Sequence, residues 1–186
     1  MKKLLGVVII FVAAILLTAC RGGRELDHEL DFRSVLDVDS DTVLRLGDSL
    51  SDFENALGSG LEMEAEWFGD RENFAIYSFA NGILEVFFLD GEAVSITQTE
   101  ESARFQFLEM SFDMTAADIY ERFIALEYDF DFVAWYDRFY DSNGREVSNS
   151  EEADYIATIT YRLIDILGND TDEGILRLNI SRTDWH

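Results

Sequence analysis

Hydrophobic and polar residues alternate in three consecutive runs near the middle of the chain, and this alternation predicts β-strands. The runs cover 74–79, 83–89 and 93–97, and the turns between them are Asn81-Gly82 and Asp90-Gly91. Asn-Gly and Asp-Gly between apolar runs are strong signals for tight hairpins. The pattern therefore predicts a three-stranded antiparallel meander.

A short helix is predicted just before this meander. Ser49 and Asp52 have the spacing of a capping pair, and apolar side chains including Phe53 then fall on one helical face. Gly58 supplies a helix stop. A run beginning at Val43 precedes the helix and opens the predicted folded region.

The second half of the chain repeats the start of this pattern. Thr115 and Asp118 stand 66 positions after Ser49 and Asp52 and predict a second helix, running to about Leu126. Two tandem helix-plus-meander repeats, 43–100 and 105–182, are one interpretation, and a chance match between two short amphipathic helices is the other. Further strands are expected at 64–68, 132–140, 155–164 and 174–181.

These elements predict an α+β fold, an antiparallel sheet with short helices on one face, forming a single domain over 43–186. The 83–89 strand is apolar on both faces. Leu84, Val86 and Phe88 share one face, whereas Phe87 and Leu89 share the other. One face can pack on the helices, so the other must meet a loop of the chain, a second copy or a partner.

The N-terminus has the pattern of a processing signal. Lys2 and Lys3 precede an apolar stretch, 4–17, that is short for a membrane span. The stretch ends in Leu17-Thr18-Ala19-Cys20, which resembles the lipobox of bacterial lipoproteins. The resemblance implies a signal peptide over 1–19 and a lipidated Cys20, with an uncleaved anchor helix as the alternative.

We therefore expect an extracytoplasmic domain held on the cell membrane through acylated Cys20. The acidic segment 20–42 shows little periodicity and is predicted to be a tether. Because Cys20 is the only cysteine, the chain can form no intrachain disulfide.

Charge narrows the range of partners. The 186 residues include 38 acidic and 14 basic side chains, a net charge of −24. Without Lys2 and Lys3 the chain has no lysine, and twelve arginines leave a net charge of −26. This balance argues against binding to nucleic acid, which needs a basic surface. The 48% apolar content still predicts a packed core.

Candidate catalytic groups are few. His28 lies in the predicted tether and His186 at the C-terminus, so neither is well placed in a preorganised site. A carboxylate-based cell-wall hydrolase stays open as an alternative, since 38 acids offer many pairs. Asp37, Asp39 and Asp41 match a calcium loop only in part, because Thr42 stands where that loop needs glycine. We expect no metal or cofactor and keep a passive, cation-holding surface protein as a third alternative.

The strand, capped helix and meander also resemble the helix-plus-antiparallel-sheet repeats of the beta-lactamase-inhibitor-protein-like group. The resemblance covers roughly 43–181 and rests on these runs: Leu46-Gly47-Asp48-Ser49, Ala56-Leu57-Gly58 and Phe88-Leu89-Asp90-Gly91-Glu92-Ala93-Val94. It implies a binding module rather than an enzyme.

The leading hypothesis is a lipoprotein that binds a protein, peptide or envelope ligand through a sheet face. Tryptophan, tyrosine and arginine dominate binding energy at interfaces. The candidate anchors are Trp67, Trp135, Tyr136, Arg162 and Arg177.

Overall fold

A computed structural model describes residues 30–64, 73–108, 110–128, 133–162 and 174–184. The predicted signal peptide and Cys20 lie outside the described residues, as does most of the strand expected at 64–68.

The described chain contains two α-helices and many strands, as the sequence predicts. The first half contains β1 (Ser34–Asp37), β2 (Thr42–Arg45), α2 (Leu50–Leu57), β3 (Leu61–Met63), β4 (Phe74–Phe79), η1 (Ala80–Gly82), β5 (Leu84–Leu89) and β6 (Glu92–Gln98). The second half contains β7 (Phe105–Phe107), α3 (Ala116–Arg122), β8 (Ile124–Tyr128), β9 (Val133–Tyr140), β10 (Glu146–Val147), η2 (Ser150–Glu152), β11 (Tyr155–Arg162) and β12 (Gly174–Arg182). The predicted α+β class is confirmed.

The strands form two antiparallel sheets. The larger has nine strands in the order β10-β9-β11-β12-β6-β5-β4-β3, with β8 also pairing with β9. The smaller has the order β2-β1-β7. In the large sheet the two halves of the chain meet where β6 pairs with β12, and Ile96 lies opposite Ile180 at this junction.

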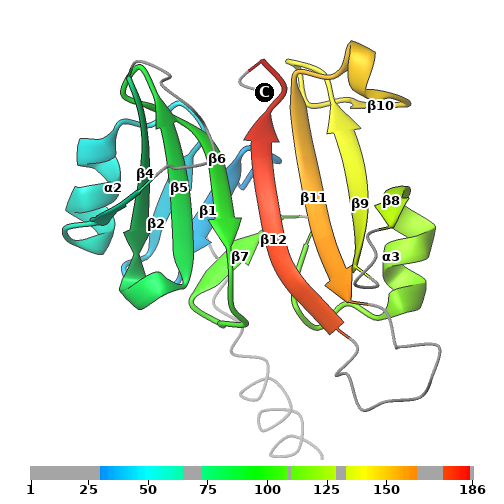
Figure 1. Cartoon of the computed structure of the whole chain (residues 1–186), viewed down its shortest axis with the longest axis horizontal. Helices are drawn as coiled ribbons and strands as arrows, with labels where there is room; N and C mark the ends of the chain where they lie inside the picture. Colours follow the sequence, from blue (N-terminus) through cyan, green and yellow to red (C-terminus); the bar gives the residue numbers. More distant parts are fainter. Residues whose placement is uncertain (1–29, 65–72, 109, 129–132, 163–173, 185–186) are drawn as a thin grey trace, which may run out of the picture.

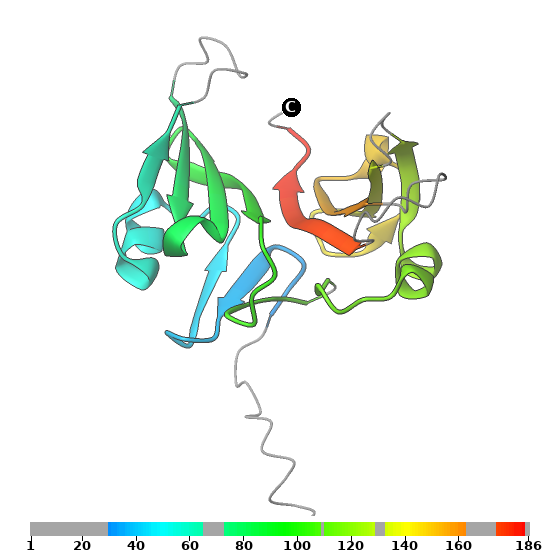
Figure 2. The same ribbon diagram turned by 60° about the horizontal axis from the view of Figure 1, so that its bottom comes forward.

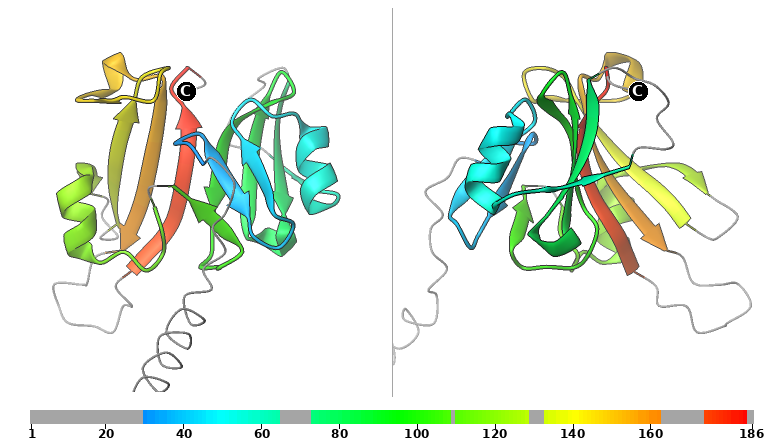
Figure 3. Two further views of the ribbon diagram at one scale, coloured as in Figure 1. Left: turned by 180° about the vertical axis from the view of Figure 1, so that it is seen from behind. Right: turned by 60° about the vertical axis from the view of Figure 1, so that its left-hand side comes forward.

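One face of the nine-stranded sheet is covered. Figure 3 shows α2, α3 and the small sheet on the same side of the large sheet, with the small sheet between the helices. Phe53 of α2, Ile119 of α3 and Val35 of β1 belong to one buried cluster with the large sheet. Figure 2 shows the two ends of the large sheet curving toward its opposite side.

The predicted meander is confirmed, because β4, β5 and β6 pair in sequence order. Asp90 and Gly91 both have positive φ, 53° and 84°, which is the backbone that a tight hairpin turn requires. Asn81 and Gly82 also have positive φ, within the 3-10 turn η1.

Both helices begin where the sequence predicts. Ser49 caps α2 and Thr115 caps α3, each in a reciprocal capping box with the aspartate three residues later. The predicted end of α3 near Leu126 is wrong. The helix ends at Arg122, and 124–128 is strand β8, because pairing with β9 provides the backbone hydrogen bonds of this segment.

The fold also begins earlier than predicted. Residues 34–37, expected to lie in a tether, form β1, and all four side chains are buried. This strand lies at the centre of the small sheet, between β2 and β7, so both of its edges are paired. A strand buried on both faces has no polar alternation, which is why periodicity did not reveal it.

The two halves share one order of elements. A helix followed by four antiparallel strands describes both α2-β3-β4-β5-β6 and α3-β8-β9-β11-β12, with β10 and η2 inserted in the second. The sequence repeat itself stays a prediction.

Candidate binding face

The side of the nine-stranded sheet opposite the helices is the candidate binding face, and we call it the open face. It is turned toward the viewer in Figure 1, where no described helix or strand crosses it. In β5, Leu84, Val86 and Phe88 are buried toward the helices, whereas Glu85 and Phe87 are half-buried on the open face. The predicted two-sided strand therefore has one side in the core and one side on this face.

A row of polar side chains crosses the open face. The strand register places Asp137, Thr158, Asn179, Thr97 and Glu85 side by side on five neighbouring strands. Because opposite residues in paired strands point to the same side of a sheet, these side chains form one continuous line.

Asn179 connects the two halves within this row. Its Nδ2 donates to Ser95 Oγ at 2.7 Å and to Thr97 Oγ1 at 2.8 Å, both on β6. Ser95 and Thr97 are themselves buried. The amide therefore ties β12 to β6 by side-chain as well as backbone hydrogen bonds.

Asp137 is the most unusual member of the row. Its side chain is almost fully buried, with 5% exposed. Burial raises the pKa of Asp137 to about 6, against the lowering effect of a hydrogen bond from Thr158. Its Oδ1 has no hydrogen-bond partner among the described residues. Near neutral pH this carboxyl is therefore close to its titration point.

Two of the five predicted anchors lie on the open face, on either side of β11. Trp135 and Arg177 both pair with Thr160 of β11, one from each side. Two strand spacings separate their backbones by roughly 10 Å. Trp135 is half-buried and Arg177 is exposed, so both can reach a partner.

The prediction for Tyr136 is wrong. It follows Trp135 in β9 and therefore points to the opposite side, where it is only 1% exposed in the core. Its ring meets that of Tyr120 edge-on, with 5.5 Å between centroids. Trp67 and the side chain of Arg162 lie outside what the structure describes.

An apolar region lies at the β3 end of the open face. The rings of Phe74 and Phe87 are 6.1 Å apart. On the edge strand β3, Leu61 is 72% exposed and Met63 is 39% exposed, and the register places both on this side. Leu61, Glu62 and Met63 do alternate between apolar and polar, but the strand expected from the sequence begins at Glu64 and therefore misses the two residues.

The described carboxylates of the polar row are too far apart for glycoside hydrolysis. Asp137 and Glu85 are separated by four strand spacings, roughly 19 Å, whereas the two acids of an inverting glycosidase lie about 6.5–9.5 Å apart. Among the described residues no group of three or more histidine, cysteine or acidic side chains is arranged to hold a metal ion.

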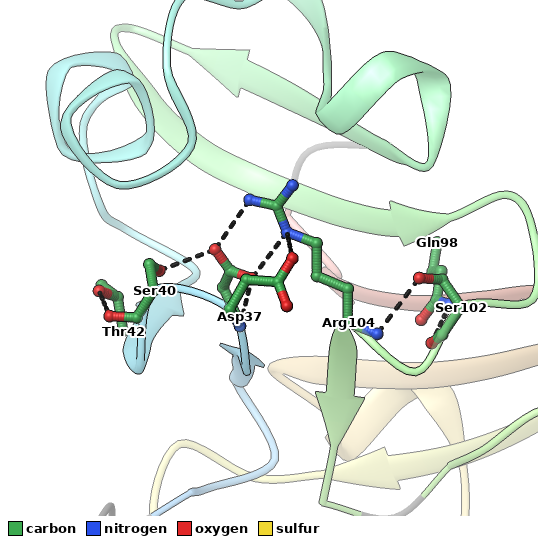
Figure 4. A network of polar contacts seen from close by, with 7 residues as sticks. Asp37, Ser40, Thr42, Gln98, Ser102 and Arg104 are labelled. Atoms are coloured by element: carbon green, nitrogen blue, oxygen red, sulfur yellow. Dashed lines mark hydrogen bonds and ion pairs between the residues drawn. The ribbon is translucent and has the colours of Figure 1, made fainter.

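Asp37, a candidate calcium ligand in the sequence, has a structural partner instead. Arg104 donates from Nε to Asp37 Oδ1 at 2.7 Å and from a terminal nitrogen to Oδ2 at 2.9 Å (Figure 4). Ser40 Oγ donates to the same carboxylate at 2.7 Å. Burial alone would raise the pKa of Asp37, but these hydrogen bonds and the Arg104 charge outweigh it and lower the pKa. Sequence reasoning missed the pair because 67 positions separate its members.

No described helix has the length and apolar character needed to span a bilayer. In comparisons with known proteins, no family model, curated protein sequence or solved structure matches the chain.

Proposed function

We propose that this chain is a lipid-anchored lipoprotein that binds an extracytoplasmic protein, peptide or envelope ligand through the open face. The observation that carries the proposal is that half-buried Trp135 and exposed Arg177 lie on either side of β11, on a sheet face that no described helix or strand covers. Tryptophan and arginine are the side chains most enriched in binding hot spots.

The neighbouring surface supports the same proposal. Leu61, Met63 and the Phe74–Phe87 ring pair add apolar area at one end of the face. Exposed apolar surface next to polar groups is typical of interaction sites. The polar row of this face extends over five neighbouring strands, an extent that suits a macromolecular partner better than a small substrate.

The anchor would hold the domain close to the bilayer. Nine residues lie between Cys20 and Leu30, where the described chain begins. Even fully extended, they span only roughly 35 Å. A partner would therefore meet the open face near the membrane surface.

The anchor is tested with Cys20→Ala in the producing cell. We expect the variant to move from the membrane fraction to the soluble fraction or the medium, because the thioether attachment point is lost. Equal membrane association of variant and parent would contradict the anchor.

The binding face is tested by site-specific photo-crosslinking in the native envelope. A crosslinker at position 177 should give discrete adducts that Trp135→Ala reduces by about tenfold or more. A crosslinker at position 135 should give adducts that Arg177→Ala reduces to the same extent. Arg145→Ala is the matched control, because Arg145 is exposed and its side chain pairs only locally, with Asp141. The proposal is contradicted if a crosslinker at position 145 gives adducts as strong as those from positions 135 and 177.

A further inference from the structure

A cavity of about 490 Å³ lies on the covered side of the molecule, where β7 meets β6 and β12. It is separate from the open face, because Gln98 and Leu178 on its wall point toward the core side and are 1% exposed. Its volume is within the range of about 300–1,000 Å³ that small-molecule sites have.

The apolar part of its wall comes from the edge of the core. These side chains are Phe105, Phe107, Met110, Phe112 and Leu178. Phe105, Phe107 and Met110 are each less than a tenth exposed, so the wall is held in place by packing. A ligand that fits here must present an apolar body.

Every charged side chain on the wall is negative. Glu101 and Asp113 are both exposed at the rim, and none of the described residues that line the cavity is a lysine, arginine or histidine. The nearest cation in the sequence is Arg104, whose guanidinium points toward Asp37 and away from Gln98 and Ser102 (Figure 4). The charge on this wall is therefore complementary to a cation.

Gln98 is a fixed polar part of the cavity wall. Its Nε2 donates to the backbone carbonyls of Glu100 at 2.8 Å and Ser102 at 3.2 Å. These two carbonyls fix the orientation of the amide, since the reversed amide would place its oxygen against them. The Oε1 atom is left without a hydrogen-bond partner among the described residues. This atom is itself buried in the wall, so the polar groups open to a ligand are those of the acidic rim.

We propose that this cavity binds a small amphipathic cation, an apolar chain or ring that carries an ammonium group. The apolar body lies against Phe105, Phe107 and Leu178, and the ammonium group lies toward Glu101 and Asp113. Binding here is independent of the open face.

The test compares three ligands of similar shape on the full chain, measured by calorimetry or ligand-observed NMR at low salt. They are 2-phenylethylammonium, 2-phenylethanol and 3-phenylpropionate. We expect the ammonium ligand to bind about tenfold more tightly than the carboxylate, a difference of about 1.4 kcal/mol. Added salt should reduce this preference, because it screens the rim charges.

Two variants place the ligand in the cavity. Glu101→Gln with Asp113→Asn should remove most of the preference for the cation, whereas Glu54→Gln with Glu62→Gln, which do not line the cavity, should keep it. Ala103→Trp should fill the cavity from its exposed rim and weaken all three ligands. The proposal is overturned if none of the ligands binds, if the carboxylate binds as well as the amine, or if Ala103→Trp leaves binding unchanged.

Discussion

Two buried aspartates respond to the fold in opposite directions. Asp37 is fully buried and accepts two hydrogen bonds from Arg104, so its pKa is lowered. Asp137 is almost as buried but faces no described arginine partner, and its pKa is raised to about 6. Burial raises the pKa of both carboxyls, but only Asp37 has an arginine beside it, whose hydrogen bonds and charge outweigh the effect of burial.

Asp137→Asn should stabilise the protein near neutral pH. Because the folded-state pKa of about 6 lies above the unfolded value of about 3.9, the folded state binds the proton more tightly, and stability is lost as pH rises from 4 through 6. The asparagine variant lacks this loss. We therefore compare the free energies of unfolding of variant and parent, measured with urea at about pH 4 and about pH 7.5. The difference between the two proteins should shift in favour of the variant by roughly 2 to 3 kcal/mol from pH 4 to pH 7.5. A pH-independent difference would refute the assignment.

Arg104→Ala should destabilise the protein by about 3 kcal/mol at pH 7, since it leaves the buried Asp37 carboxylate without its cation. Asp37 has a lowered pKa, so its contribution is present at neutral pH and lost as pH falls through the folded-state value. The variant should therefore lose less stability than the parent on acidification below pH 4. Arg145→Ala, which breaks an exposed pair, should cost less than about 1 kcal/mol.

At the scale of elements, short local signals determine where the helices begin. Ser49 Oγ accepts from the Asp52 backbone N–H, and the Asp52 carboxylate accepts from the Ser49 backbone N–H at 2.9 Å. Thr115 and Asp118 repeat this arrangement, also with a 2.9 Å return bond. The caps thus satisfy backbone donors that have no partner within the helix.

Ser49→Ala should lower the free energy of unfolding by about 1 kcal/mol, because the N-cap acceptor is lost. Asn55→Ala, in the exposed interior of the same helix, is the matched control and should be neutral or slightly stabilising, since alanine has the higher helix propensity. Thermal unfolding of both variants measures the difference. A larger loss in Asn55→Ala than in Ser49→Ala would contradict the role of the cap.

At the scale of the whole molecule, the two halves share one sheet and one core. β6 of the first half pairs with β12 of the second through Ile96 and Ile180, and both side chains belong to the common buried cluster. α2 and α3 contribute Phe53 and Ile119 to the same cluster. Because the core is continuous across the junction, we expect the halves to unfold together.

Ile180→Ala should therefore destabilise the whole molecule by about 2 to 5 kcal/mol while keeping a single unfolding transition. Far-UV circular dichroism reports both halves, and tryptophan fluorescence reports mainly the second. If the halves unfold together, the two signals should have the same unfolding midpoint. Separate midpoints in the variant or the parent would show that the halves fold as independent units.

The sequence predicted elements whose causes are local. The hairpin at Asp90-Gly91, both capping boxes and the two-sided character of β5 all depend on residues a few positions apart. It failed at β1 and β8, where pairing with distant strands outweighs the local pattern. Of the candidate anchors, Trp135 and Arg177 lie on one face, whereas Tyr136, which follows Trp135 in the sequence, points into the core.

The sequence by itself determined the class of fold, the meander, the helix starts and the strongly acidic character of the chain, because these follow from composition and from contacts between near neighbours. Only the tertiary structure decided that Asp37 pairs with Arg104, that Asp137 is buried on the open face beside Thr158, and that a cavity with acidic edges lies beside β7. The physical reason is that the burial, the partner and the pKa of a side chain depend on residues that lie tens of positions away in the sequence. Strand pairing decides which of these residues come into contact.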